Sequence, residues 1–311
     1  MRRLKNDIPD VFSNPTASPS LTQEKKILQD ANKSWWEKSP MRYDWNSEIS
    51  HESFTKPFYE EIDRRFFMNA SRYMPWKKIP FDALIDFESL HDRNVLEIGV
   101  GNGSHAQLLA QYSGKFTGID LTDYAVKSTT ERMKCFGLKA DIIRMDAEKL
   151  DFDDNSFDFV WSWGVIHHSS DTEGILKEIN RVLVPGGRAA IMVYHKSIWF
   201  YYILGVLYRG ILQGDLFKTR SLHKTVQRYT DGAIARYYTI KEWKAITEGL
   251  FSTESVRIFG TKSEILPLPS GRIKNFMENA VPDVFTRILT NTFHMGSFLV
   301  TVLKKAEDGL S

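Results

Sequence analysis

Cysteine is almost missing from this chain, which has Cys135 alone among its 311 residues. A single cysteine excludes an internal disulfide framework and a cysteine-based zinc cluster. No compact spacing of metal-ligating side chains is present, so we expect no bound metal. The chain also lacks a large excess of charge of one sign, since its net charge is +2. Such a small net charge creates no long-range field that would require nucleic acid or an anionic membrane as a partner.

Long hydrophobic runs are missing as well. The longest run, residues 198–207, contains Gly205 and is followed by Arg209, and it is too short to cross a membrane. The basic start at residues 1–5 has no apolar segment behind it, so we expect neither a signal peptide nor an integral membrane span. With 42% apolar and 26% charged residues the composition is that of an ordinary globular chain, and we expect a cytoplasmic protein.

What the chain does contain is a buried strand that leads into a glycine-rich turn. Residues 95–98 are apolar except for Glu97, glycines follow at positions 99, 101 and 103, and a helical pattern continues over residues 105–112. Glycine lets the backbone turn tightly and approach a ligand closely. The free N–H groups at the start of the helix suit a polar or anionic cofactor group. This pattern predicts a nucleotide-type ligand.

The spacing of the turn differs from two common nucleotide motifs. The dinucleotide fingerprint requires a glycine three positions after its second glycine, and position 104 here is Ser. The Lys-Ser/Thr pair of a P-loop is missing after the turn. Glu97 stands two residues before the first glycine, which suits a cofactor with a cationic amino group better than a pyrophosphate.

The E-x-G-x-G-x-G pattern resembles motif I of the class I S-adenosylmethionine (SAM) methyltransferases, and the likeness continues over residues 93–195. A Pro-Gly-Gly turn at residues 185–187 is typical of the small-molecule, methyltransferase type 11-like branch of that family. The resemblance implies an α/β fold with a Rossmann-like, mostly parallel seven-stranded sheet and helices on both faces. An N-terminal helical lid and an inserted helical cap complete the expected architecture.

The expected organisation has three parts along the chain. Residues 1–25 form a flexible N-terminus, residues 26–90 a helical lid, and residues 91–311 the SAM-binding domain. Two insertions interrupt this domain, a cap over about residues 196–238 and a second insertion over about residues 261–295. The expected strands cover residues 95–98, 115–120, 139–146, 157–163, 188–194, 254–260 and 296–305, and the last of these runs antiparallel.

The resemblance also implies SAM as the cofactor, with S-adenosylhomocysteine as the product. Gly99, Gly101 and Gly103 would shape the turn around the methionine part, and Glu97 would orient the turn or accept a hydrogen bond from the cofactor amine. Asp120 lies 21 residues after Gly99, about the spacing at which a nucleotide site places a carboxylate for ribose hydroxyls. The other expected cofactor residues are Leu121, Asp146 and Ala147, the last two at the adenine edge, and Trp163 as a pocket wall.

Four side chains at the ends of the fourth and fifth strands are candidates for a catalytic base: His167, His168, Tyr194 and His195. Imidazole titrates near neutral pH, and a positioned base accelerates a reaction by about 10²–10⁴-fold. A histidine here is also often structural, bonding a loop carbonyl, and both interpretations stay open. The aromatic residues expected to line the substrate or lid are Trp35, Trp36, Tyr59, Trp199 and Tyr202, with ordinary core packing as the alternative.

The leading prediction for function is in-line methyl transfer from SAM to a small organic acceptor. O-methylation of an aromatic, apolar or lipid-like substrate comes first, and C- or N-methylation of a prenyl, lipid or secondary metabolite is the alternative. Outside this class, a non-catalytic SAM-binding regulatory protein and an NAD-dependent oxidoreductase remain open. A nucleic-acid substrate is not expected, because residues 161–164 lack the Asn/Asp-Pro-Pro-aromatic tetrad. The aromatic cap offers a homodimer interface as another use.

Overall fold

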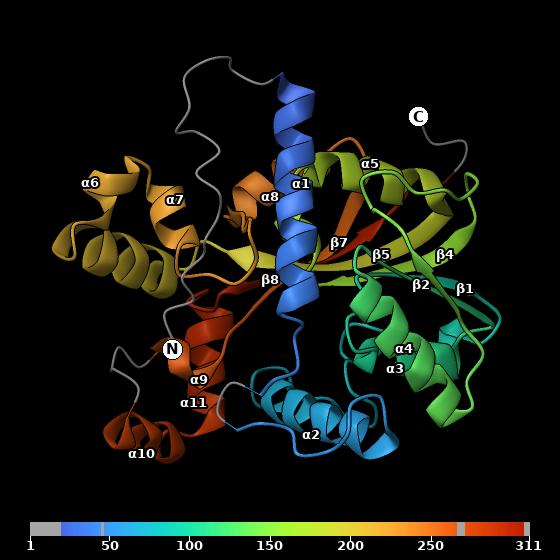
Figure 1. Cartoon of the computed structure of the whole chain (residues 1–311), viewed down its shortest axis with the longest axis horizontal. Helices are drawn as coiled ribbons and strands as arrows, with labels where there is room; N and C mark the ends of the chain where they lie inside the picture. The colour runs from blue at the N-terminus through green and yellow to red at the C-terminus, as the bar shows by residue number, and fades with distance from the viewer. Residues whose placement is uncertain (1–19, 45–46, 266–270, 308–311) are drawn as a thin grey trace.

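A mostly parallel sheet organises the molecule (Figure 1). The computed structural model describes residues 20–44, 47–265 and 271–307. The strand order is β3-β2-β1-β4-β5-β8-β7, in which β8 runs antiparallel to both of its neighbours. The strands are β1 (Asn94–Ile98), β2 (Lys115–Asp120), β3 (Asp141–Arg144), β4 (Phe157–Trp163), β5 (Leu183–His195), β6 (Tyr237–Tyr238), β7 (Ser252–Phe259) and β8 (Phe298–Lys304). The expected fold class is confirmed, and the two-residue β6, paired in parallel with the end of β5, adds an eighth strand to the seven expected.

Helices cover both faces of the sheet. In Figure 1, α3 and α4 lie on one side of the strands and α5 and α8 on the other. The longer helices are α1 (Leu21–Lys38), α2 (Lys56–Tyr73), α3 (Ser104–Tyr112), α4 (Asp123–Phe136), α5 (Thr172–Val182), α8 (Ile240–Thr247) and α10 (Arg272–Ala280). The shorter α-helices are α6 (Asp215–Thr219), α7 (Leu222–Gln227), α9 (Lys262–Ile265) and α11 (Asp283–Arg287). The 3₁₀ turns are η1 (Phe87–Leu90) and η2 (Ile166–His168), and the π-helices are η3 (Ile198–Leu212) and η4 (Ile288–Thr292).

The two faces of the sheet form separate apolar cores. Leu109 of α3 and Met133 of α4 pack with Trp161 of β4 on one face. Ile179 of α5 and Trp243 of α8 pack on the other. A strand buried on both faces reads as a nearly continuous apolar run, which is why β1 and β4 were recognisable in the sequence.

The N-terminal segment differs from the expectation of a flexible stretch up to residue 25. Helix α1 begins at Leu21, because the hydroxyl of Ser20 accepts a hydrogen bond from the backbone N–H of Gln23 and the Gln23 side chain accepts one from the N–H of Ser20. This capping box starts the helix at that point. The flexibility predicted for residues 1–19 lies outside the described residues, as does the part of the second insertion at 266–270.

Both insertions consist mainly of helices where the structure describes them. The cap consists of η3, α6, α7 and β6, and the second insertion of α9, α10, α11 and η4. Figure 1 shows α6 and α7 at the left of the molecule and α10 and α11 below them. Among the described helices, none has the length and apolar character needed to span a bilayer.

Candidate active site

The glycine turn after β1 has the backbone conformation that its composition predicts. Gly99, Gly101 and Gly103 have φ angles of +84°, +54° and +80°, all in the left-handed region that favours glycine. A Cβ atom at Gly99 would lie 2.3 Å from Cγ2 of Val165, so the turn packs tightly against the segment after β4. A Cβ at Gly101 would meet no atom within 4 Å, and this residue borders a cavity.

Asp120, the last residue of β2, holds the turn in place. One of its carboxylate oxygens accepts a hydrogen bond from the N–H of Gly101 at 3.2 Å. The other accepts from the N–H of Thr122 at 2.9 Å and from its hydroxyl at 2.8 Å. Burial raises the pKa of Asp120, and the bonds from Thr122 oppose that rise. The carboxylate therefore links the ends of β1 and β2 at one edge of the sheet.

A buried pair of titratable side chains lies close to the turn. Oε1 of Glu97 is 3.8 Å from Nδ1 of His105, the second residue of α3. Burial raises the pKa of Glu97 well above its usual range and lowers that of His105 to about 3. The second oxygen of Glu97 and Nε2 of His105 are buried without a hydrogen-bond partner. Unpaired buried polar atoms are costly, which marks this as a place where a ligand donor or acceptor would be stabilising.

A cavity of about 350 Å³ opens over the carboxyl ends of the strands. Its walls come from the glycine turn, the residues after β2, β3 and β4, the end of β5, and helices α1 and α2. This is the edge of an open α/β sheet at which ligands bind. Three carboxylates border the cavity, those of Asp120, Asp146 and Asp231, and no lysine or arginine does so among the residues that the structure describes.

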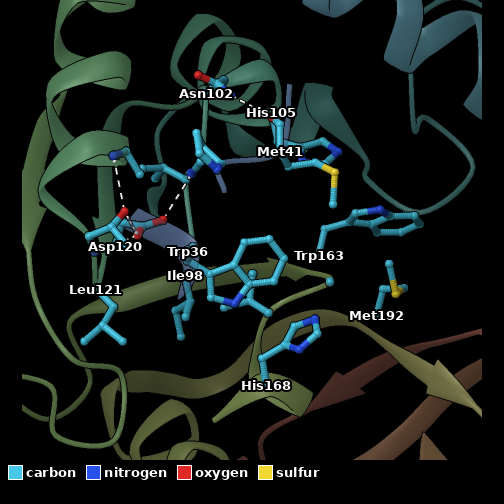
Figure 2. A pocket seen from close by; sticks show the side chains of 18 of the residues that line it. Trp36, Met41, Ile98, Asn102, His105, Asp120, Leu121, Trp163, His168 and Met192 are labelled. Carbon is cyan, nitrogen blue, oxygen red and sulfur yellow. Dashed lines mark hydrogen bonds between the residues drawn. The ribbon is translucent and has the colours of Figure 1, made fainter. Parts of the chain in front are cut away.

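Helix α1 closes the cavity with one polar face and one aromatic side chain. Gln29, Asn32 and Trp36 follow at helical spacing and all border the cavity. The amide of Gln29 donates to Asp146 at 3.0 Å. The indole of Trp36 packs edge-on against the imidazole of His168, with ring centroids 5.1 Å apart. In Figure 2 it is drawn between Asp120 and Leu121 on one side and Trp163 and Met192 on the other.

The cavity is also bordered by His168, Tyr194 and Asp231, of which Tyr194 lies near the end of β5. Nδ1 of His168 lies 2.5 Å from the carbonyl oxygen of Ile234. A carbonyl only accepts, so Nδ1 bears the proton, and Nε2 is left with a free electron pair and no partner. The hydroxyl of Tyr194 donates to Asp231 at 2.8 Å. Burial lowers the pKa of His168 and raises that of Tyr194 well above its usual range, so both are neutral near pH 7.

Comparisons with known proteins agree with this geometry. The model of a methyltransferase domain family matches residues 96–191. The Yarrowia lipolytica sterol 24-C-methyltransferase is 36% identical over 96 residues, which cover 30% of this chain and 25% of that protein. The Mycobacterium tuberculosis phthiotriol/phenolphthiotriol dimycocerosates methyltransferase is 38% identical over 100 residues, 32% of this chain and 36% of that protein.

Residues 96–191 are thus similar to methyltransferase domains, a likeness of family that agrees with the fold. A chain in the complex between the Haloferax volcanii Trm112 methyltransferase activator and a methyltransferase has the same fold, with a TM-score of 0.52 and 16% identity over 81% of this chain and 96% of that one. The sequence matches span only a quarter to about a third of the relatives' lengths, 25% and 36% for the two named. They therefore identify the domain and leave its acceptor to be argued from the site.

The residues present fit the cofactor that this methyltransferase domain implies. SAM is positively charged at its sulfonium and at its amine, and the cavity is bordered by carboxylates and aromatic rings with no basic side chain among the described residues. The open space at Gly101 and the unpartnered atoms of Glu97 and His105 lie at the turn expected to receive the methionine part. A pyrophosphate would lie at the glycine turn, and this turn has Ser104 in place of the third glycine of the dinucleotide fingerprint.

The structure brings together most of the residues expected at the cofactor. Two of them, Glu97 and Gly103, do not border the cavity. Glu97 is buried beside His105, and Gly103 caps α3 at a point where a Cβ would meet Cδ of Arg132 at 2.9 Å. The expected cofactor residues that border the cavity are Gly99, Gly101, Asp120, Leu121, Asp146, Ala147 and Trp163.

The candidate catalytic residues divide into two groups. His168 and Tyr194 border the cavity, whereas His167 and His195 do not. His167 is fully buried, and its ring lies 4.0 Å from that of Tyr194 between centroids. Nδ1 of His195 bonds the carbonyl oxygen of Gly296 at 2.8 Å, the structural role that a histidine at this place can have.

Among the aromatic residues expected at the lid or substrate, only Trp36 borders the cavity. Tyr59 is fully buried and its hydroxyl donates to the carbonyl of Ser128 at 2.6 Å, so it serves the contact between α2 and α4. Trp35 packs edge-on against Trp36, with centroids 4.5 Å apart. Trp199 and Tyr202 belong to η3 of the cap, and Tyr202 faces solvent with 43% of its surface exposed.

Several cavity residues were not anticipated. Gln29 and Asn32 had a usable signal, because they share the helical face of Trp36 at spacings of seven and four residues. Asn102 also had one, as it lies inside the glycine turn, where its amide donates to the carbonyl of Met41 at 2.7 Å. Asp231 had none, since it lies in an irregular stretch of the cap.

Proposed function

We propose that this protein transfers a methyl group from SAM to a neutral, lipid-like acceptor, and that the acceptor atom is a hydroxyl oxygen. When bound, SAM supplies a methyl group already activated by its sulfonium. What the chain must provide is alignment, exclusion of water and removal of the acceptor's proton. Alignment of two reactants contributes about 7–11 kcal/mol to such a reaction.

The cofactor would occupy the half of the cavity formed by the strand ends β1 to β3. In this proposal the glycine turn receives the methionine part, Asp120 the ribose hydroxyls, and Asp146 with Ala147 the adenine edge. Asp120 already accepts from Gly101 and Thr122, so its position is fixed before the ligand arrives. A preorganised acceptor of this kind loses little entropy on binding.

The charge of the cavity supports a neutral acceptor. A free carboxylate or phosphate on the acceptor would lie near Asp231 without a lysine or arginine from the described lining to neutralise it. Burying an unpaired anion is strongly unfavourable. Phe66, Tyr73, Met192 and Phe298 border the same cavity and offer apolar contact, which suits an aliphatic or aromatic body.

The single observation that carries the catalytic assignment is the free Nε2 of His168. Its imidazole is neutral and fixed through Nδ1 to Ile234, and Nε2 has no partner within the protein. In the proposed reaction Nε2 would take the proton that the acceptor hydroxyl loses when its oxygen replaces the sulfur on the methyl carbon. The pKa of Tyr194 is raised well above its usual range, so its hydroxyl keeps its proton at neutral pH and would not act as the base. Held by its hydrogen bond to Asp231, this hydroxyl would orient the acceptor instead.

Two alternatives from other classes are less well supported. An NAD-dependent oxidoreductase would be expected to carry the third glycine of the dinucleotide fingerprint, where this chain has Ser104. A non-catalytic SAM-binding protein would not need cavity walls beyond the cofactor residues, whereas this cavity is also bordered by His168, Tyr194 and Asp231. N-methylation remains the alternative inside the family, because the Asp231 carboxylate would also attract an ammonium.

Transfer of labelled methyl groups tests the proposal. The full chain is incubated with methyl-labelled SAM and three acceptors of the same chain length: a long-chain alcohol, the amine and the carboxylic acid. We expect label in the alcohol and none in the acid. His168→Gln should lower kcat by about 10²–10⁴-fold with SAM affinity unchanged, and the His223→Gln control, outside the cavity lining, should not. Label in the amine alone, or full activity of His168→Gln, would refute the proposal.

A further inference from the structure

The cap carries an exposed apolar surface that the catalytic site does not use. We define the cap face by six side chains of η3 and α6 that are between 43% and 77% exposed: Tyr202, Leu207, Tyr208, Ile211, Leu212 and Phe217. Apolar side chains gathered on one element to this extent mark an interaction site more often than a chance surface.

The geometry of η3 explains why these side chains face outward together. It is a π-helix, in which each turn takes more than four residues, and Tyr202, Leu207 and Ile211 follow at spacings of five and four. The opposite side of the helix packs inward on α7. Gly205 is buried there, where a Cβ would lie 2.7 Å from Cγ2 of Val226.

The same segment concentrates positive charge. Residues 198–228 contain five basic residues, Arg209, Lys218, Arg220, Lys224 and Arg228, and one acid, Asp215. The segment therefore carries +4 while the whole chain carries +2. Asp215 is buried and pairs with Lys218 at 3.3 Å and Arg228 at 3.7 Å, yet the side chains of these two cations remain 68% and 50% exposed. Aromatic and aliphatic side chains next to exposed cations are the composition of helices that lie in a bilayer interface.

We propose that the cap face docks on the surface of an anionic lipid bilayer. The apolar side chains would enter the headgroup boundary, and Lys218, Arg220, Lys224 and Arg228 would attract the anionic headgroups. With 15 residues η3 is too short to cross the membrane, so it would lie in the interface. Asp231, in the same cap, borders the cavity, so docking would hold the active site near a source of lipid-like molecules.

The charge also argues against a second copy of this chain as the occupant. In a twofold dimer the same patch faces itself, so a segment of +4 would meet another of +4. Juxtaposed like charges oppose such an interface. An anionic bilayer satisfies both the apolar and the basic side chains.

Vesicle sedimentation tests the proposal with the full chain and needs neither SAM nor an acceptor, so its outcome is separate from that of the methyl-transfer experiment. We expect binding to vesicles that contain phosphatidylglycerol, weaker binding to pure phosphatidylcholine, and loss of binding at high salt because the charges are screened. Lys218→Gln with Arg220→Gln should lower the partition coefficient for the anionic vesicles about thirtyfold.

Leu212→Glu with Phe217→Glu should abolish vesicle binding, since these two side chains are the most exposed of the cap face, at 70% and 77%. Met68→Glu, at a 49% exposed position on α2, is the matched control and should bind as the parent does. Circular dichroism of each variant verifies the fold. Absence of binding to anionic vesicles, equal binding by all variants, or a dimer that Leu212→Glu with Phe217→Glu dissociates would overturn the proposal.

Discussion

Gly99 combines two demands at one position, a left-handed backbone and a lack of space. Gly249 has almost the same φ, +81° against +84°, but a Cβ there would meet nothing within 4 Å. We predict that Gly249→Ala lowers the free energy of unfolding by about 1–2 kcal/mol from backbone strain alone. Gly99→Ala should cost about 1–3 kcal/mol more because the new methyl collides with Val165.

Urea unfolding of the two variants measures this difference. Adding Val165→Ala to Gly99→Ala removes the two nearest atoms and should recover part of the loss. Equal losses for Gly99→Ala and Gly249→Ala would show that the contact with Val165 does not matter.

His168 gives the reaction a defined pH dependence. The proposed base must be unprotonated, and burial holds its pKa below the usual value of about 6.5. We predict that kcat/KM is constant from neutral pH down to about pH 6.5 and falls only when the pH passes the lowered pKa of His168. A pH–rate profile checks this. If kcat/KM already begins to fall above pH 7 as the pH is lowered, His168 is excluded as the base.

At the scale of single residues, the cofactor half of the site was more predictable than the acceptor half. Asp120 and Asp146 stand at strand ends, where the sheet geometry alone brings them together. Asp231 and Met41 reach the cavity through irregular segments, which have no periodicity from which a side-chain direction follows.

Helix α1 is held over the cavity by polar contacts more than by apolar burial. The carboxylate of Glu37 accepts hydrogen bonds from the N–H groups of Asp123 at 2.9 Å and Tyr124 at 3.0 Å, at the start of α4. Lys25 pairs with Asp171 at 2.6 Å at the other end of α1. Breaking such contacts exposes polar groups to water and no apolar core, so we propose that α1 opens as a lid.

Removing the charge of Glu37 should weaken the attachment of α1 to the start of α4. We predict that Glu37→Gln speeds amide hydrogen exchange across α1 by about 10–100-fold, since bonds to a charged acceptor contribute about 1.5–3 kcal/mol. Asp30→Asn makes the same charge change on an exposed position of α1 and should leave exchange as it is. Exchange that is equally slow in both variants would mean that Glu37 does not anchor the lid.

At the scale of elements, β1, β2, β4 and α3 could be predicted nearly to the residue, because their apolar runs and the glycine turn are local signals. The fifth strand could not, since β5 begins at Leu183, five residues before the expected start, and includes the Pro-Gly-Gly stretch that was expected to be a turn. The cap could be predicted only as an aromatic, helical insertion. Its π-helix and its packing through Gly205 depend on contacts with α7, and tertiary contacts of this kind leave no mark in local sequence.

The molecule as a whole buries neutral histidines that the unfolded chain would protonate in acid. Burial lowers the pKa of His167 well below its usual value. Its unfolded pKa is about 6.5, so the unfolded state binds the extra proton below that pH and stability falls as the pH drops. Each such histidine contributes a slope of about 1.4 kcal/mol per pH unit, from about pH 6.5 down to its folded pKa.

We predict that His167→Phe removes one such slope. Chemical unfolding of parent and variant, measured at several values between about pH 6.5 and pH 5, gives the difference. A constant difference in the free energy of unfolding between the two curves reflects packing. The result that tests the prediction is the difference between their slopes with pH. Parallel curves would show that His167 is protonated in the folded protein or does not titrate in this range.

Binding of SAM is the claim on which the rest depends, and calorimetric titration of the full chain with SAM and, separately, with NADH measures it directly. We predict saturable SAM binding and none of NADH. Asp120→Asn should weaken SAM binding by about 10–100-fold, while Asp92→Asn, whose parent side chain is 99% exposed, should bind as the parent does. Binding of NADH without SAM would contradict the account at its base.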